Sequence, residues 1–361
     1  MMPTSTYTIH NFSAGPCILP QSVMHQAADA VRELDASGLS LIEISHRSKA
    51  FVDIMEEARN LVRSELGLPD HFEVLFLQGG ASLGFLTAAM NFTPEGSSMD
   101  YAVTGTWAKK ALKEAMKMGN AQAITSSEDT GFNCIPPLPS QSNAGAVHIT
   151  TNNTIYGTQY ATDPNTDKPM VADMSSDIFS RPVDLSKYAC IYAGAQKNMG
   201  PAGTVLYIYD KDAAGKHGRD LPSYLDLEVH AGKDSMFNTP PVFAIYTSML
   251  TLRWLKAEGG VLEMQKRNAA KASCLYGEIN RNPLFNGFAK SDSRSVMNVT
   301  FTAADDAHTQ MFLEACAAAD INGIKGHRSV GGFRASMYNA LPISSVEVLV
   351  DVMKEFERTH G

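Results

Sequence analysis

Short apolar runs alternate with helical patterns between about residues 20 and 260 of this chain. Five short, mainly apolar runs are expected to be strands: 72–78 (FEVLFLQ), 146–150 (AVHIT), 170–174 (MVADM), 189–193 (ACIYA) and 204–209 (TVLYIY). Between them lie segments such as 83–92 (LGFLTAAMNF), whose apolar residues recur at helical spacing. Strands that alternate with helices are typical of an α/β domain with a mostly parallel sheet.

The pattern changes at Gly259 and Gly260, which interrupt a helical stretch. Beyond them we predict a helix, an alternating strand at 295–302, a further helix, a Gly-rich strand region and a last helix. Ser344 with Glu347 predicts a capping box at the start of that last helix.

A chain of 361 residues exceeds the size at which one core usually stops growing, so about two domains are expected. We predict a large domain over residues 16–258 and a smaller α+β domain over residues 259–361. The N-terminal segment, residues 1–15, is expected to pack with the smaller domain.

Charge and cysteine content limit the possible partners. The formal net charge of −8 disfavours nucleic acid and anionic membranes, because both attract an excess of Lys and Arg. The five cysteines form neither a CxxC pair nor a metal-ligand spacing, so we expect reduced thiols and no metal site. No apolar run approaches the roughly 18 residues of a membrane helix, and no signal peptide is recognisable. We therefore expect a cytoplasmic protein.

Lys197 directly follows an apolar run and lies among small residues in the segment YAGAQKNMGP. Loop lysines are mostly exposed, but at the carboxyl end of a sheet desolvation lowers the pKa of a lysine toward that of a Schiff-base nucleophile. Asp173 ends another apolar run, where a carboxylate is costly unless it is paired. A helix cap or a structural role would explain Asp173, and so would a protonated pyridine nitrogen, which pyridoxal phosphate chemistry requires.

Three further segments suit the same cofactor, although each has an ordinary structural explanation. Gly80, Ala81 and Ser82 follow a predicted strand and open a helix, which makes a site for a phosphate or simply a tight turn. The turn does not match GxGxxG, so a dinucleotide has little support. Trp107 could stack on a pyridine ring or pack in the core. Thr154 could bond the cofactor's phenolic oxygen or belong only to a turn.

Positive charge is concentrated at three places on this acidic chain: His46-Arg47, His327-Arg328 and Arg334. Arg328 and Arg334 flank a Gly-rich segment where backbone can approach a ligand closely. Surface salt bridges are the ordinary explanation of a single Arg. Because guanidinium groups suit carboxylate and phosphate, the set predicts a substrate that carries both groups.

The ordered set of motifs resembles the phosphoserine aminotransferase family, class V members of the fold-type I pyridoxal phosphate enzymes. The motifs span the chain: 11–16 (NFSAGP), 43–48 (EISHRS), 78–82 (QGGAS), 172–176 (ADMSS), 195–198 (AQKN), 235–241 (SMFNTPP), 326–328 (GHR) and 334–339 (RASMYN). One departure is that some family members place Arg or Thr in the turn where this chain has Ala81-Ser82, which leaves the affinity for the cofactor open.

The resemblance implies a homodimer whose active sites lie at the subunit interface. Lys197 would form the Schiff base, with Asp173 on the pyridine nitrogen, Trp107 on the ring face and Thr154 on the phenolic oxygen. The family's cofactor-phosphate ligands would be Gly80, Ala81, Ser82 and Gln196 of one subunit, with Asn238 and Thr239 of the other.

For the substrate, the resemblance implies that Arg334 binds the α-carboxylate. His327 and Arg328, with His46 and Arg47 of the partner subunit, would bind the phosphate or the side-chain carboxylate of glutamate. The implied reaction is ping-pong transfer from L-glutamate to 3-phosphohydroxypyruvate, giving O-phospho-L-serine and 2-oxoglutarate in serine biosynthesis. 4-Phosphohydroxy-L-threonine, in pyridoxine biosynthesis, is a further expected substrate.

Three alternative functions fit the sequence less well. A class V aminotransferase for alanine, serine or glyoxylate needs no second anion pocket, so the two His-Arg pairs argue against it. A cysteine desulfurase needs a nucleophilic Cys on a mobile loop, whereas Cys316 falls in an apolar helical pattern. A catalytically inactive cofactor-binding protein would not need Lys197 and Asp173.

Overall fold

The computed structural model describes residues 9–214 and 218–361. Its main feature is a seven-stranded sheet of order β2-β10-β9-β8-β5-β3-β4. In that order the strands are Phe72–Gly79, Gly203–Asp210, Tyr188–Gly194, Met170–Asp173, Ala146–Thr150, Ser98–Val103 and Asn120–Ser126. Only β10 is antiparallel to its neighbours. All five apolar runs are strands of this sheet, which confirms the predicted α/β class with a mostly parallel sheet.

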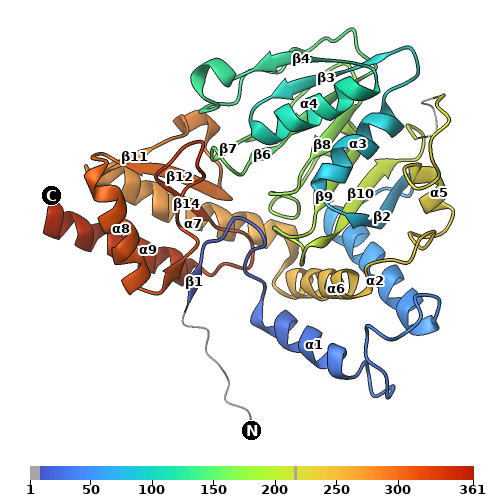
Figure 1. The fold of residues 1–361 in the computed structure, drawn as a ribbon, viewed down its shortest axis with the longest axis horizontal. Coiled ribbons are helices and arrows are strands. Elements are labelled where there is room, and N and C mark those ends of the chain that lie inside the picture. The colour runs from blue at the N-terminus through green and yellow to red at the C-terminus, as the bar shows by residue number, and fades with distance from the viewer. Residues whose placement is uncertain (1–8, 215–217) are drawn as a thin grey trace.

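Helices cover both faces of the sheet (Figure 1). One face packs against α3 (Ala81–Phe92) and α4 (Thr106–Met118), and the other against α2 (Lys49–Leu66) and α6 (Val242–Ala257), with α1 (Gln21–Arg32) on α6. Side chains alternate accordingly along β2, because Leu75 and Leu77 belong to the core with α3 whereas Val74 and Phe76 belong to the opposite core. None of the helices in the described ranges is long and apolar enough to span a bilayer.

The C-terminal part forms a separate layer of strands and helices (Figure 1). Its antiparallel sheet has the order β11-β12-β14 and packs with Phe312 and Phe356 in a third core. The N-terminal β1 (His10–Asn11) pairs in parallel with β13 of this part, and Phe12 enters the same core. The elements are α7 (Gly260–Arg281), β11 (Phe285–Gly287), β12 (Asn298–Ala303), α8 (Ala307–Ala318), β13 (Ile321–Asn322), β14 (Phe333–Ser336) and α9 (Ile343–His360).

Helix α7 belongs to both parts of the molecule. Val261 and Met264 near its start pack in the core of the large sheet, whereas Ala272 and Leu275 pack in the C-terminal core. The glycine pair therefore separates two helices without separating the two cores, because the first turns of α7 still cover the large sheet.

The predicted capping box at Ser344 is wrong. Helix α9 begins at Ile343 with Pro342 as its N-cap residue and no side-chain cap bond. The φ of Pro342, −72°, is fixed by its ring and suits the start of a helix. Ser344 therefore lies inside the first turn, and the neighbouring Ser345 instead shares a 2.9 Å hydrogen bond with His10.

Candidate active site

The predicted cofactor residues come together at the carboxyl edge of the large sheet. Asp173 ends β8, and Lys197 lies just beyond the end of the parallel strand β9. Thr154 lies in the turn between β6 (Asn152–Asn153) and β7 (Thr158–Gln159). The Lys197 amine donates a 2.8 Å hydrogen bond to the Thr154 hydroxyl and lies 5.7 Å from the centroid of the Trp107 ring. Such an edge is where open α/β sheets bind their ligands.

Burial makes Lys197 a weaker base than a lysine in water. Desolvation lowers the pKa of its amine, and the Asp173 carboxylate acts in the opposite direction. The Arg334 guanidinium lowers the pKa further because the two cations repel. Burial and the repulsion by Arg334 both favour the neutral amine, which is the form that acts as a nucleophile and a base.

Asp173 is 5% exposed and is held by its own turn. Its Oδ1 accepts the Ser175 backbone N–H at 2.9 Å and the Ser175 hydroxyl at 2.6 Å. Burial raises the pKa of this carboxyl, while the Lys197 charge and the Ser175 bonds oppose the rise. A second buried carboxylate lies nearby: Asp177 accepts a hydrogen bond from Thr151, and burial raises its pKa to about 6. The Asp-x-Ser spacing is a local signal for Ser175 that sequence reasoning did not use.

The turn after β2 opens helix α3 with Gly80 as its N-cap residue. The first amides of a helix have no intrahelical acceptor, so those of Ala81 and Ser82 are available to an anion. Gln196 lies beside this turn, and Gly194, which has no side chain, leaves room for the Gln196 side chain to approach the turn. A Cβ at Gly194 would lie 2.7 Å from the Gln196 side-chain oxygen and 3.2 Å from the Ala81 nitrogen. The chain thus forms a cradle for a phosphate at the end of β9.

Arg334 reaches the same place from the C-terminal part. It lies on β14, and its Nη1 donates to the Thr154 carbonyl at 3.4 Å. Its Nε is buried and has no hydrogen-bond partner, and no carboxylate forms an ion pair with it in the described part of the chain. Burial lowers the pKa of the guanidinium, which still stays charged at neutral pH because arginine is so strong a base. A half-buried guanidinium without a carboxylate partner in the described ranges is suited to an anionic substrate group.

His327 and Arg328 lie on the loop between β13 and β14, and β14 carries Arg334. Partial burial lowers the pKa of His327, and so do the charges of Arg334, Arg328 and Lys110. Sequence reasoning missed Lys110. Its amine lies 4.4 Å from the centroid of Trp107, one helical turn earlier on α4, and that spacing was the available signal.

Four residues assigned by the resemblance to a shared site do not join this cluster within the chain. The Asn238 amide donates to the Gln78 side chain at 2.7 Å, and the Gln78 amide donates to the Thr239 carbonyl. Because both bonds are with Gln78 of β2, Asn238 and Thr239 lie beside the end of that strand, and both are exposed. His46 and Arg47 lie between α1 and α2, where Arg47 is exposed. Their roles across a subunit interface stay predictions.

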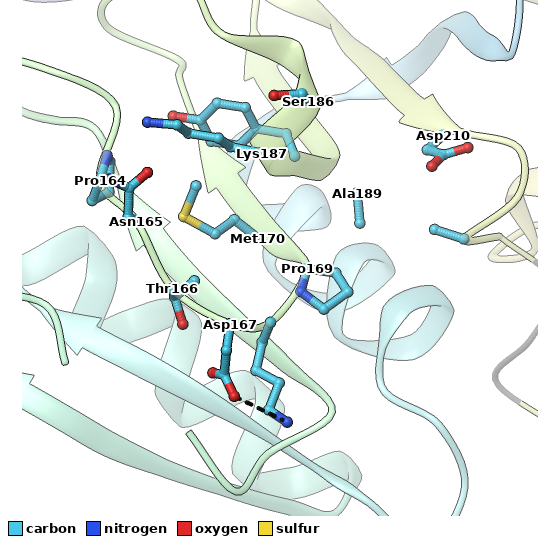
Figure 2. Close-up of a pocket in the computed structure, with 13 residues that line it drawn as sticks. Pro164, Asn165, Thr166, Asp167, Pro169, Met170, Ser186, Lys187, Ala189 and Asp210 are labelled. Atoms are coloured by element: carbon cyan, nitrogen blue, oxygen red, sulfur yellow. Dashed lines mark ion pairs between the residues drawn. The ribbon is translucent and has the colours of Figure 1, made fainter. Parts of the chain in front are cut away.

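A cavity of about 410 Å³ lies away from these residues (Figure 2). Its lining includes Met170 at the start of β8, Ser186 just before β9 and Asp210 at the end of the antiparallel β10. These positions mark the amino edge of the sheet, opposite Asp173 and Lys197. Neither Lys197 nor Asp173 lines this cavity, so we do not assign the reaction to it.

Lys197 near the Trp107 ring and Asp173 at the end of the neighbouring strand suit an enzyme that holds pyridoxal phosphate, with the turn before α3 as a site for its phosphate. A family model for class-V aminotransferases matches residues 9–349. The chain belongs to this family.

The similar proteins within this family are named for one activity. The chain is 55% identical over 350 residues to the phosphoserine aminotransferase of Flavobacterium psychrophilum, covering 96% of this chain and 98% of the relative. Among solved structures, phosphoserine aminotransferase from Bacillus circulans subsp. alkalophilus superposes with a TM-score of 0.93 at 40% identity, covering 98% and 99% of the two chains. The pyridoxal phosphate-bound enzyme from Trichomonas vaginalis gives 0.89 at 34% identity, covering 96% and 99%.

The residues present fit pyridoxal phosphate. The Trp107 indole N–H is buried without a partner in the described ranges, the ring packs against the core of the large sheet, and the Lys197 amine lies over the ring. Asp173 uses one oxygen for Ser175, which leaves the other for a pyridinium N–H. Ala81 and Ser82 offer amides to the phosphate. Lys197, Asp173, Trp107 and this turn would therefore hold the cofactor.

Proposed function

We propose that this enzyme transfers the amino group of L-glutamate to 3-phosphohydroxypyruvate, giving O-phospho-L-serine and 2-oxoglutarate. The observation that carries the proposal is the set of cations around Lys197. Arg334 is half-buried and forms no ion pair with a carboxylate in the described ranges, and Arg328 and His327 lie on the adjoining loop. A substrate with both an α-carboxylate and a phosphate would neutralise this charge, whereas alanine or glyoxylate would leave part of it unpaired.

The cofactor, when bound, supplies an electron sink for the electron pair left at the substrate's Cα. The Lys197 amine would take the proton from Cα, and the lowered pKa of this amine favours the unprotonated form that the step needs. Asp173 would hold the cofactor's pyridine nitrogen and favour its protonated form. Thr154, bonded to Lys197 at 2.8 Å, fixes where the amine rests between steps. Arg334 orients the α-carboxylate so that the Cα proton faces Lys197.

We further propose a cytoplasmic homodimer in which His46, Arg47, Asn238 and Thr239 complete the partner's site. All five cysteines are free thiols, which suits a reducing compartment. The exposure of Asn238 and Thr239 beside the phosphate turn leaves them accessible to a second subunit.

The division into domains 16–258 and 259–361 belongs to the same proposal, and the pairing of β1 with β13 supports adding the N-terminal segment to the smaller domain. Residues 1–8 of that segment lie outside the described residues.

The pocket would also accept 4-phosphohydroxy-L-threonine, because that amino acid carries the same two anionic groups. We include it as a second substrate.

The test is a coupled assay with L-glutamate and 3-phosphohydroxypyruvate beside unphosphorylated hydroxypyruvate. We expect kcat/KM to favour the phosphorylated acceptor by at least roughly tenfold, since a charge-assisted bond to phosphate contributes about 1.5–3 kcal/mol. Lys197→Ala is the control and should abolish turnover of both. Equal turnover of the two acceptors would refute the assignment of phosphohydroxypyruvate.

A further inference from the structure

The segment of residues 14–17 lies against the backbone of Lys197, and the mechanism above does not use it. The Cys17 backbone N–H donates to the Gln196 carbonyl at 3.2 Å, and the Cys17 thiol donates to the Lys197 carbonyl. Burial raises the pKa of this thiol to about 12, so the thiol keeps the proton that it donates. The peptide groups before and after the Lys197 Cα are therefore both bonded to one residue of this segment.

Gly15 brings the same segment against the side chain of Lys197. A Cβ at Gly15 would lie 3.2 Å from Cγ of Lys197 and 3.7 Å from the Gln196 carbonyl oxygen. The φ of Gly15 is +143°, a conformation that favours glycine. The aliphatic stem that carries the Lys197 amine to Thr154 thus rests on the backbone of Gly15.

Tyr338 holds this segment from the C-terminal part. It is 1% exposed, and its hydroxyl donates to the Ala14 carbonyl at 2.7 Å. The same hydroxyl accepts a hydrogen bond from the Asn298 side-chain amide at 3.3 Å. Asn298 is itself held from the large domain, because its side-chain oxygen accepts the Asn152 amide at 2.7 Å. Residues of both parts of the molecule therefore fix the position of the Tyr338 hydroxyl.

We propose that Tyr338 is a positioning residue for Lys197: by holding the Ala14 carbonyl, its hydroxyl keeps residues 14–17 against the lysine. The inference rests on the proposed function, in which the Lys197 amine takes the Cα proton. A lysine stem is long and flexible, so a wall on one side restricts where the amine rests. Such restriction matters because a misplacement of about 1 Å can cost about a hundredfold in rate.

The test compares Tyr338→Phe with Tyr276→Phe in the holoenzyme. Tyr276 is a matched control, since its hydroxyl also donates to a backbone carbonyl, that of Ser295 at 3.0 Å, within the C-terminal part. We expect Tyr338→Phe to lower kcat with L-glutamate by roughly tenfold and to leave KM within about twofold of the wild type. The primary isotope effect with Cα-deuterated glutamate should rise, because proton transfer becomes more fully rate-limiting. Tyr276→Phe should change none of the three.

A measurement without turnover uses the cofactor-free protein. Desolvation is the main cause of the lowered pKa of the Lys197 amine. Release of the segment would admit water, so an amine-selective reagent should label Lys197 at higher pH in Tyr338→Phe than in the wild type or Tyr276→Phe. A second variant, Gly15→Ala, directs a methyl group at Cγ of Lys197 and should also lower kcat.

Unchanged kcat or an unchanged labelling pH in Tyr338→Phe would overturn the inference, and so would equal changes in Tyr276→Phe. Normal kcat in Gly15→Ala would overturn it as well, because the segment would then not determine the position of the lysine. If the wild type fails to transaminate L-glutamate, the proposed function fails, whereas a labelling shift confined to Tyr338→Phe would still support the positioning of Lys197.

Discussion

Replacing Asp173 with Asn tests the electrostatic centre of the site with little disturbance of the fold. The amide keeps an oxygen where Oδ1 accepts both bonds of Ser175, at 2.9 and 2.6 Å. The turn after β8 should therefore remain intact. What changes is the charge, together with the atom at Oδ2, where an acceptor becomes a donor.

The size of the effect follows from the bond that is lost. A hydrogen bond to a charged group contributes about 1.5–3 kcal/mol, which corresponds to a loss of roughly ten- to a hundredfold in kcat. The free energy of unfolding, by contrast, should stay the same or increase. Burial raises the pKa of Asp173, so its ionised form costs folding free energy above that pKa, and the neutral amide removes this cost. The cofactor-free variant should unfold at the same urea concentration as the wild type or a higher one.

Two assays separate the charge from the fold. Single-turnover kinetics with L-glutamate give the loss in rate, and urea unfolding of the cofactor-free protein gives the stability. A third measurement uses Lys197, whose pKa the Asp173 carboxylate raises. Removing that charge should shift the reaction of Lys197 with an amine-selective reagent to lower pH. Near-normal kcat with the cofactor bound would refute the pairing of Asp173 with the pyridine nitrogen.

Further predictions concern the substrate, the dimer and a buried lysine. Arg328→Ala should lower the steady-state kcat/KM for the phosphorylated acceptor and for glutamate by roughly ten- to a hundredfold but leave that for alanine unchanged. Arg334→Ala should lower kcat/KM for all substrates. If both variants affect the substrates in the same pattern, the two roles are contradicted. Mixing inactive Lys197→Ala and Asn238→Ala subunits should restore activity if the site is shared, and no recovery after verified exchange would place Asn238 in its own chain's site. Lys271 is 1% exposed, donates to three backbone carbonyls at 2.7–3.1 Å, and has its pKa lowered by burial to about 7. As the pH rises, the Lys271 amine loses its proton in the native state at a lower pH than in the unfolded state, so the wild type gains stability that a methionine cannot gain. Lys271→Met should therefore lower the free energy of unfolding in urea by more at about pH 9 than at about pH 7, by up to roughly 1.4 kcal/mol per pH unit. A difference that does not change with pH would contradict the lowered pKa.

Much of the large sheet could be predicted from local pattern. The run at 146–150 is β5 with the same bounds, 170–174 extends one residue beyond the end of β8, and 189–193 is one residue shorter than β9 at each end. The prediction was accurate because buried parallel strands are continuous apolar runs, which neighbouring residues encode by themselves. The start of α9 was mispredicted, because a proline one residue earlier and the contact of Ser345 with His10, far away in the sequence, decided it.

The chemical identity of the site was also readable from the sequence, since Lys197 and Asp173 lie at the ends of predicted strands and the ordered motifs resemble one family. The geometry was not readable. The bond from Lys197 to Thr154 joins residues 43 positions apart, and Asn238 meets Gln78 across 160 positions.

What the sequence alone determined is therefore the order of the strands and helices, the residue types of the site and the family. What only the tertiary structure decided is which charges are buried, which are neutralised and which remain free. Lys109 and Lys110 are adjacent in the sequence, yet one pairs with Glu128 and the other lies over Trp107. Secondary structure follows from the periodicity of neighbours, whereas a pKa or a free cation depends on the dielectric surroundings and charges that distant segments supply when they pack.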